Sequence, residues 1–452
     1  MIRISNIKLA IGYTEHDMRQ AVSNKLKLNE GEISKIELMK RAIDARKKDN
    51  IHYVCTIDVF VRENEKRVLS KLKDNNISIY EREKYKLPII RSEPRYRPIV
   101  VGFGPAGMFA SLTLAQCGMN PLIIERVECI EERKKSVERF WKDRILDENS
   151  NIQFGEGGAG AFSDGKLTTG IKDSRIRKVL EDMVSFGAPR EILYDAKPHV
   201  GTDKLEKVVI NVRKNIQDLG GEFLFNSQFI DFTDENGKIK EARIKNTKTG
   251  EISNIRCKKI ILALGHSARD TFEMLHEKSL EIAQKSFAVG VRIEHKREMI
   301  DTSQYGDSRP DEPGAADYKL SCHLKNGRGV YTFCMCPGGA VVAASSEKGM
   351  VVTNGMSYFK RDLDNSNSAI LVGVTPNDFK SEHPLAGVYF QREIEKRAFN
   401  AAGEDYSAPV QKLGDFVADR ATSSFEKIYP SYRPDFKCAR ISECLPALVT
   451  DS

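Results

Sequence analysis

The sequence predicts an α/β protein with three parts: an N-terminal α+β domain, a domain built on a parallel sheet, and an antiparallel β-rich domain inserted into the second. Three observations support this prediction. Short apolar runs alternate with amphipathic stretches near the N-terminus, a glycine-rich turn follows the strand that begins at Ile99, and short β-like runs dominate after Ala283. We expect segments 1–95, 96–282, 283–410 and 411–452, the last returning to the second domain.

Length and composition limit the class of protein. The chain has 452 residues, of which 40% are hydrophobic and 30% charged, so it can bury a cofactor within several domains. No apolar run approaches the roughly 18 residues that span a bilayer, and Arg3, Asn6 and Lys8 interrupt the N-terminal one, so we expect neither a membrane span nor a signal peptide. Nine widely spaced cysteines favour a reducing cytoplasm over a secreted disulfide scaffold.

The positive charge is concentrated at the N-terminus. Residues 1–97 contain 22 Lys and Arg against 14 Asp and Glu, a net charge of +8, whereas the whole chain carries +7. Such an excess can attract nucleic acid or an acidic partner, or can simply be a solvated basic face. We favour the solvated face, because no recognised nucleic-acid motif accompanies the charge.

The N-terminal segment has the βαββαβ order of a ferredoxin-like domain. The predicted elements are strand 2–11, helix 15–26, segment 33–46, strand 51–61, helix 63–72 and strand 77–80. Segment 33–46 is ambiguous, but as a strand it would form a hairpin with strand 51–61. Two prolines and no apolar periodicity in 91–98 indicate a linker to the next domain.

A glycine-rich motif opens the second domain. The strand Ile99–Val101 is followed by Gly102, Gly104 and Gly107 at G-x-G-x-x-G spacing, with Pro105 and Ala106 between the last two, and then by a helix from Met108 to Gln116. These glycines allow a tight turn, close approach of a pyrophosphate and close packing of helix on strand. The helix N-terminus offers free N–H groups to the phosphates.

An acidic residue ends the second strand of this unit. Glu125 follows the strand Pro121–Ile124, at the distance where a carboxylate accepts hydrogen bonds from an adenosine ribose. The same charge argues against a 2′-phosphate there. Arg126 and Arg133 are candidate phosphate or adenine contacts, with solvated surface charge as the equal alternative.

Two later glycine sites favour FAD over NAD. Residues 155–166 form a second glycine-rich loop, and the strand Lys259–Leu264, of buried type, ends at Gly265. Three glycine sites far apart in the sequence suggest one extended dinucleotide. The cofactor residues predicted in these two segments are Gly155, Gly157, Gly158, Gly160, Lys166 and Gly265.

Five segments together resemble a family of bacterial FAD-dependent dehydrogenases with no assigned substrate. These are 102–107 with Glu125 and Arg126, 155–166, 197–203, 264–270 and 331–339. The resemblance implies noncovalent FAD on a Rossmann-like fold with an inserted domain, and it implies no known reaction. Family members carry a late glycine-rich segment over the flavin, which this sequence lacks, so we expect a chain that is truncated at its C-terminus.

The catalytic candidates are His266, Cys334 and Cys336. His266 follows the strand that ends at Gly265, where it could act on a substrate or simply cap a turn. On a regular strand Cys334 and Cys336 would point to one face with Cα atoms about 6.6 Å apart, near the upper limit for a disulfide. The alternative is that both cysteines pack as small apolar residues. The sequence has no second cysteine pair at metal-site spacing, which argues against zinc.

The sequence therefore predicts an FAD-dependent oxidoreductase that transfers hydride or electrons to or from an unknown small molecule. With only one G-x-G-x-x-G segment between a predicted strand and a predicted helix, there is no evident second Rossmann domain, so NAD(P)H would bind only transiently, or another protein would supply electrons. An RNA-modifying flavoprotein that uses the basic N-terminal domain and a non-catalytic remnant are the alternatives. We expect no membrane association, and the sequence does not address the oligomeric state.

Overall fold

Contacts divide the chain into two units in the computed structural model, which describes residues 1–90, 95–307 and 313–452. The N-terminal unit contains residues 1–86, 166–200 and 297–317, and the main unit contains the remainder. The four segments expected from the sequence differ from this division, because 166–200 and 297–317 group with the N-terminal domain. Residues 91–94 of the expected linker lie outside the described residues.

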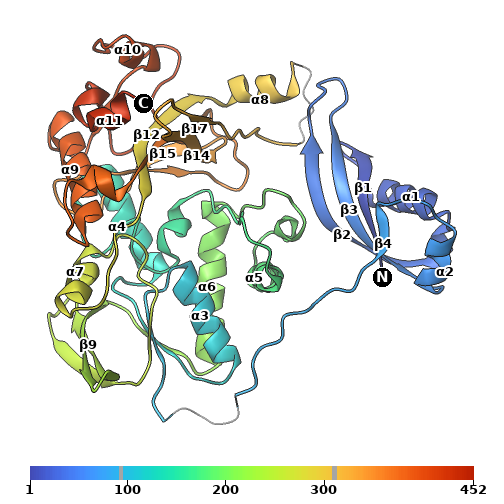
Figure 1. The fold of residues 1–452 in the computed structure, drawn as a ribbon, viewed down its shortest axis with the longest axis horizontal. Helices are drawn as coiled ribbons and strands as arrows, with labels where there is room; N and C mark the ends of the chain where they lie inside the picture. The colour runs from blue at the N-terminus through green and yellow to red at the C-terminus, as the bar shows by residue number, and fades with distance from the viewer. Residues whose placement is uncertain (91–94, 308–312) are drawn as a thin grey trace. The chain divides into compact units, whose positions relative to one another are not determined.

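The N-terminal unit has the βαββαβ order (Figure 1). Its elements are β1 (Ile2–Ala10), α1 (Glu15–Leu26), β2 (Ile33–Asp44), β3 (His52–Val61), α2 (Glu65–Ser70) and β4 (Ile77–Ile79). The antiparallel sheet has the order β2-β3-β1-β4, and alternate apolar side chains of β1 and β3 form its core. The ambiguous segment 33–46 is a strand, and the ferredoxin-like prediction is confirmed.

A clamp at Arg41 attaches the segment 166–200 to this sheet. The Arg41 guanidinium donates to both carboxylate oxygens of Asp195, at 2.8 and 3.3 Å. Its backbone N–H donates to Tyr194 O, and its carbonyl accepts from Ala196 N, so Asp195 forms an isolated parallel bridge with Arg41 at the edge of β2. The unit also contains α5 (Ser174–Ser185) and α8 (Arg297–Tyr305).

A four-stranded parallel sheet is the centre of the main unit. Its order is β11-β5-β6-β7, with β5 (Ile99–Val101), β6 (Leu122–Ile124), β7 (Glu222–Leu224) and β11 (Ile260–Leu262). Helices α3 (Pro105–Gln116), α4 (Ile130–Asp143) and α6 (Thr202–Asp218) connect these strands in the Rossmann-like manner. The expectation that residues 259–264 form a buried strand is wrong: Ile261 and Leu262 are 37% and 41% exposed, because β11 is an edge strand among the described residues.

Two antiparallel sheets of three and four strands also belong to the main unit, and both lie within the sequence that follows α6. The smaller sheet contains β8 (Ser227–Glu235), β9 (Lys238–Asn246) and β10 (Ile252–Arg256), and α7 (Arg269–Glu277) follows β11. The larger sheet has the order β12-β17-β14-β13, with β12 (Phe287–Lys296), β13 (Ser321–His323), β14 (Gly329–Cys336) and β17 (Asn365–Val374). The predicted antiparallel β-rich region is thereby present.

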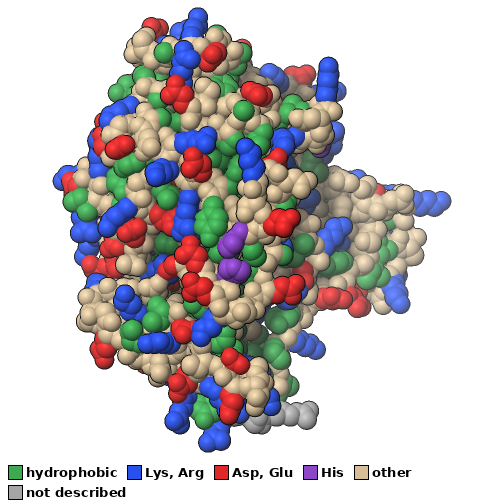
Figure 2. All heavy atoms as spheres, turned by 60° about the vertical axis from the view of Figure 1, so that its left-hand side comes forward, with side chains coloured by type: hydrophobic (Ala, Val, Ile, Leu, Met, Phe, Trp, Pro, Cys, Tyr) green, Lys and Arg blue, Asp and Glu red, His purple; other side chains and the backbone are tan. Residues whose placement is uncertain are grey.

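The C-terminal part combines a small hairpin, helices and short strands. These are β15 (Ala340–Ala343), β16 (Thr353–Met356), α9 (Ala386–Ala401), β18 (Ala408–Val410), α10 (Leu413–Val417), β19 (Phe436–Cys438) and α11 (Ala447–Thr450). No helix within the described residues is long and apolar enough to cross a membrane. Figure 2 shows basic and acidic side chains intermingled over one face of the main unit, which agrees with the small net charge outside residues 1–97.

Candidate functional site

The first glycine loop leaves no room for side chains at two positions. A Cβ atom on Gly107 would lie 1.8 Å from the carbonyl oxygen of Gly102, and a Cβ on Gly102 would lie 2.6 Å from the carbonyl oxygen of Ala263. Strand β5, the turn and helix α3 therefore pack as closely as the sequence motif predicts. Gly104 is the N-cap of α3 and Pro105 occupies the first turn, so no side chain caps this helix end. Its N–H groups and its positive dipole end remain available to an anion.

Glu125 occupies the end of β6 and is 4% exposed. Its carboxylate accepts hydrogen bonds from the backbone N–H groups of Phe103, at 2.8 Å, and of Val127, at 3.2 Å. Burial raises the pKa of this carboxyl, while both N–H donors and the charges of Arg133 and Arg126 favour the ionised form. Each oxygen accepts one backbone hydrogen bond and retains a lone pair for a second donor.

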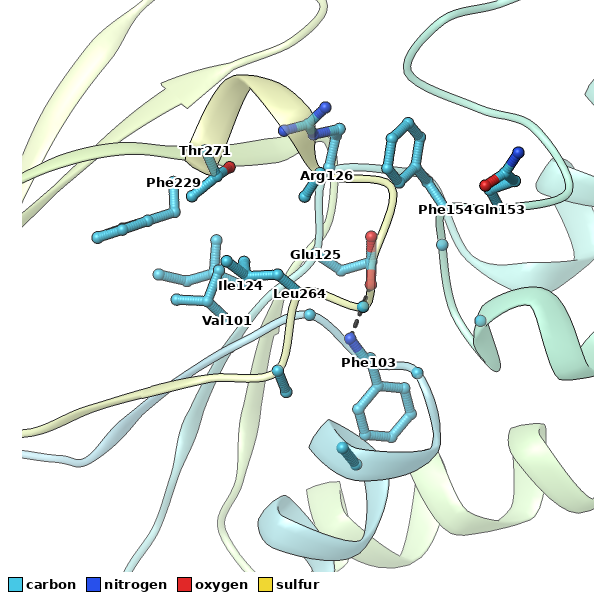
Figure 3. A pocket seen from close by; sticks show the side chains of 18 of the residues that line it. Val101, Phe103, Ile124, Glu125, Arg126, Gln153, Phe154, Phe229, Leu264 and Thr271 are labelled. Atoms are coloured by element: carbon cyan, nitrogen blue, oxygen red, sulfur yellow. Dashed lines mark hydrogen bonds between the residues drawn. The ribbon is translucent and has the colours of Figure 1, made fainter. Parts of the chain in front are cut away.

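A large pocket lies between this carboxylate and the second glycine loop (Figure 3). Figure 3 shows Phe229 and Thr271 on one side of Glu125, and Phe154 and Gln153 on the other. All three predicted glycine sites meet here. The lining includes Gly102, Gly104, Pro105, Ala106, Glu125, Arg126, Gly155, Gly158, Gly265 and His266 from the sequence prediction.

The remaining predicted cofactor residues lie elsewhere. Gly157 packs against Val209, and Gly160 faces Leu205, both on α6, so these glycines shape the loop from behind. Lys166 belongs to the N-terminal unit and is absent from the lining of this pocket.

Arg133 is a correction to the sequence prediction, because it is neither a pocket residue nor solvated surface charge. It is fully buried, and its guanidinium donates to four backbone carbonyl groups, two just before the second glycine loop and two within it. The acceptors are Asn151 O at 3.0 Å, Ile152 O at 2.7 Å, Glu156 O at 2.7 Å and Gly158 O at 3.0 Å. Burial lowers the pKa of Arg133 to about 10, against the opposing effect of nearby carboxylates. Its role is to hold the loop that lines the pocket.

Glu156 is a buried carboxyl group within the same loop. Its Oε2 accepts from Ile130 N at 2.7 Å and from Arg213 Nη1 at 2.8 Å, whereas its Oε1 is buried without a hydrogen-bond partner. Burial raises the pKa of Glu156 to about 7, although the Arg213 charge and the Ile130 N–H favour ionisation.

We expect Glu156→Gln to change how stability depends on pH. A carboxyl whose pKa is raised by folding stabilises the native state fully below its unfolded-state pKa and loses this contribution as pH rises to the native value. Between about pH 4.5 and 7 the wild type should therefore lose on the order of 3 kcal/mol relative to Glu156→Gln, with no further change above pH 7. Thermal unfolding at four pH values checks this, with the exposed Glu138→Gln on α4 as control. Parallel pH profiles for wild type and Glu156→Gln would contradict it.

Arg126 closes one side of the pocket. Its Nη2 donates to both carboxylate oxygens of Asp270, at 2.9 and 2.7 Å, and its guanidinium lies 4.9 Å from the centre of the Phe154 ring. Asp270 also accepts from Gln228 Nε2. The neighbouring Arg269 does not pair with Asp270, because its guanidinium donates to Glu347 and Glu395 instead.

His266 lines the pocket and is solvent-exposed. Its Nε2 lies 3.3 Å from Ser267 Oγ. The surrounding protein and the Arg269 charge lower the pKa of its imidazole, which therefore favours the neutral form.

Cys334 and Cys336 do not line this pocket, and the expectation of a regular strand at these residues is wrong. A β-bulge interrupts the pairing of β14 between Phe333 and Cys336, and Cys334 has a left-handed φ of 46°. Side-chain alternation fails there for this reason. Neither cysteine forms a disulfide, and Cys336 Sγ donates to the carbonyl oxygen of Cys334 at 3.3 Å.

Sequence reasoning missed several residues of the pocket wall. Gln153 and Phe154 precede the glycine loop without a motif, while Ser227, Phe229, Ala268 and Thr271 come from β8 and from the start of α7. No local pattern marks these positions, because only the tertiary fold brings them to β5 and β6. Within the described residues, no group of three or more His, Cys, Asp or Glu is arranged to hold a metal ion.

Comparisons with known proteins agree with this geometry. A family model described as "FAD-dependent protein, C-terminal domain-like" matches residues 286–452, and a domain of unknown function matches residues 1–60. An uncharacterized protein of Clostridium beijerinckii (strain ATCC 51743 / NCIMB 8052) is 48% identical over 455 residues, which cover 100% of this chain and 84% of the relative. The chain belongs to this family of FAD-dependent proteins.

Solved structures of flavoproteins give weaker matches to this chain. Glycerol-3-phosphate dehydrogenase of Bacillus halodurans complexed with FAD is 10% identical, with a TM-score of 0.27, over 63% of this chain and 48% of that chain. A geranylgeranyl bacteriochlorophyll reductase-like protein of Thermoplasma acidophilum is 12% identical, with a TM-score of 0.29, over 67% and 62%. The chain thus spans less than two thirds of these proteins, and scores this low do not establish a shared fold.

FAD is the cofactor of the family, and the pocket fits its adenosine diphosphate end. A buried carboxylate with free lone pairs matches the ribose hydroxyls, and an uncapped helix N-terminus matches the pyrophosphate. A Cβ atom on Gly104 would meet no atom closer than Gly158 Cα, at an ordinary contact distance of 3.6 Å, and both glycines line the pocket. The backbone at this helix end therefore lies directly against the pocket.

Proposed function

We propose that this FAD-dependent protein is an oxidoreductase, a dehydrogenase or reductase that binds FAD noncovalently in the pocket of Figure 3. One observation supports the proposal most strongly. Three glycine sites that lie far apart in the sequence, the N-terminus of α3 and the carboxylate of Glu125 meet around one pocket. A single extended dinucleotide explains this convergence, since each part supplies what a different part of the ligand requires.

Each element of the pocket has a distinct role in this proposal. The N–H groups at the start of α3 bind the pyrophosphate, and Glu125 accepts hydrogen bonds from the adenosine ribose. Gly155 and Gly158 allow the second loop to approach the cofactor, while Arg133 holds that loop from behind. FAD supplies hydride or single-electron transfer, and the protein orients it and tunes its potential.

The same architecture suggests how the electron donor binds and where the substrate binds. The G-x-G-x-x-G spacing occurs at residues 102–107 and 155–160, but only the first segment follows a strand and opens an α-helix. We therefore propose that NAD(P)H, if it is the reductant, binds transiently. The antiparallel sheet of β12, β17, β14 and β13 belongs to the same unit as the pocket and is the proposed surface for a small-molecule substrate.

Flavin binding and reduction test this proposal. The purified chain is titrated with FAD and monitored by visible absorption and flavin fluorescence, and it is then mixed with NADH or NADPH under anaerobic stopped flow. We expect one FAD per chain and bleaching of the flavin bands by one of the two nucleotides. Stoichiometric FAD that neither nucleotide reduces would point to a protein reductant. No FAD binding would overturn the proposal.

Gly104→Val provides a folded variant with a blocked pocket. Because a Cβ atom is tolerated at Gly104, the chain should fold, while the larger side chain fills the space above the α3 N-terminus. We expect at least a 100-fold loss of FAD affinity with an unchanged circular dichroism spectrum. Gly31→Val is the matched control, because a Cβ at Gly31 meets no atom within 4 Å and lies in the N-terminal unit.

The ion pair between Arg126 and Asp270 should slow the release of FAD. Asp270→Asn removes the charge that holds Arg126 against the pocket, so we expect FAD to dissociate roughly two to five times faster, a range set by the small strength of exposed ion pairs. Stopped-flow displacement of bound FAD measures this rate. Glu206→Gln, which removes a surface pair with Lys134 outside the pocket, should leave it unchanged.

A further inference from the structure

A chain of hydrogen bonds connects the pocket residue His266 to the backbone of Ala344, the residue that follows β15. Gln153 Nε2 donates to the carbonyl oxygen of Ala344 at 2.6 Å. The Ser267 hydroxyl donates to Gln153 Oε1, and Ser267 Oγ lies 3.3 Å from His266 Nε2. Gln153 and His266 both line the pocket, and Ser267 between them is 7% exposed.

The carbonyl group at one end of this chain determines every proton position along it. A carbonyl oxygen can only accept, so the amide of Gln153 must direct its NH2 group to Ala344 and its Oε1 to Ser267. The Ser267 hydroxyl has one proton, which it gives to Gln153 Oε1. Ser267 Oγ can then only accept from His266, so His266 must carry a proton on Nε2.

The charge of the imidazole determines the protonation state of Nδ1, the second ring nitrogen of His266. The protein around the ring displaces part of its water, and this desolvation together with the charge of Arg269 lowers the pKa of His266 below that of a free histidine. A neutral imidazole with its proton on Nε2 has an unprotonated Nδ1. His266 lines the pocket, so its unprotonated Nδ1 gives this residue a hydrogen-bond acceptor that the chain to Gln153 does not use.

We propose that Gln153 and Ser267 are positioning residues that fix His266 as the Nε2–H tautomer, so that Nδ1 accepts a hydrogen bond from a hydroxyl group of the bound cofactor. This inference rests on the proposed function for the identity of the ligand. The tautomer follows from the protein alone. A hydroxyl of the sugar or ribityl chain is the matching donor, because phosphate oxygens are acceptors and would repel an unprotonated Nδ1.

Nitrogen-15 NMR of the histidine side chains tests the tautomer without any ligand. The full chain is produced with nitrogen-15 in its eight histidines and in no other residue type. The His266 signals are assigned from the spectrum of His266→Gln. We expect Nε2 protonated and Nδ1 unprotonated at pH 7 in the wild type, and a mixture of tautomers in Ser267→Ala and in Gln153→Leu. Ser267→Thr keeps the hydroxyl and should restore the single tautomer.

Addition of FAD then tests the acceptor role. We expect saturating FAD to shift the Nδ1 resonance of His266, and His266→Phe to weaken FAD binding roughly 3- to 10-fold, the range for one hydrogen bond. A protonated Nδ1 in the free protein would overturn the inference. An Nδ1 resonance that does not change while FAD binds would overturn the acceptor role and leave the proposed function intact. Absence of FAD binding would overturn the proposed function and the assigned ligand, while the tautomer result would stand.

Discussion

Glu125→Gln should weaken FAD binding by about 100-fold. The carboxylate accepts hydrogen bonds from two backbone N–H groups. In the proposed complex it also accepts hydrogen bonds from the ribose hydroxyls. A glutamine amide has one oxygen, so its NH2 group must replace the carboxylate oxygen that faces Phe103 N–H or Val127 N–H. This NH2 group is a donor and can accept a hydrogen bond neither from that backbone N–H nor from a ribose hydroxyl. Hydrogen bonds to a charged group contribute about 1.5–3 kcal/mol each, and tenfold in affinity corresponds to about 1.4 kcal/mol. Titration of the flavin-free chain with FAD measures the change.

Two further variants make this result specific. Glu125→Asp keeps the charge at a shorter reach, so we expect partial binding, which separates loss of the carboxylate from general damage to the pocket. Glu132→Gln lies on α4, where the side chain is exposed and paired with Lys135, and it should bind FAD like the wild type. If Glu125→Gln folds and binds FAD with wild-type affinity, Glu125 is not the ribose ligand.

The glycine loop and its carboxylate could be predicted from the sequence because their information is local. The motif requires a strand, a turn and a helix within a few residues, and the fold places Gly102, Gly104 and Gly107 as this context predicts. Alternation of apolar side chains likewise identified β3, because one face of that strand is buried under α1 and α2. The three glycine sites line one pocket, as predicted, while their binding of one extended ligand stays a prediction.

Errors arose where tertiary contacts override a local pattern. A period of two predicted a regular strand at Cys334 and Cys336, but Arg292 Nη2 binds the carbonyl oxygen of Cys334 at 2.8 Å in a bulge that the pattern does not contain. Residues 166–200 follow the glycine loop directly, which suggested the FAD domain. Contacts such as the clamp between Arg41 and Asp195 join partners 154 residues apart, and no sequence periodicity reveals them.

Arg133 is the position where sequence and structure predict different experimental results. As a phosphate ligand, Arg133 would matter only when FAD is present, and lysine would replace it in part because lysine also binds phosphate. As the buried donor to Asn151, Ile152, Glu156 and Gly158, it should matter in the flavin-free protein, and lysine should replace it poorly. A single ammonium group cannot reach carbonyl groups that surround a planar guanidinium.

We therefore expect Arg133→Met to lower the free energy of unfolding of the flavin-free chain by about 4 kcal/mol, which corresponds to roughly 5–10 °C in Tm. The reason is that four buried carbonyl oxygens lose their donor. Arg133→Lys should fall between Arg133→Met and the wild type, and Arg139→Met, an exposed arginine on the same helix, should remain within about 0.5 kcal/mol. Differential scanning calorimetry without FAD measures all three.

The two interpretations of Arg133 predict different combinations of change in the Tm of the flavin-free chain and in FAD affinity. If Arg133 holds the loop, FAD affinity should fall in proportion to the loss of loop stability, because Gly155 and Gly158 line the pocket and move when the carbonyl groups lose their donor. If Arg133 binds phosphate, Tm without FAD should be unchanged while affinity falls. An unchanged Tm in Arg133→Met would therefore show that the carbonyl groups find other donors and would restore the role that the sequence alone suggested.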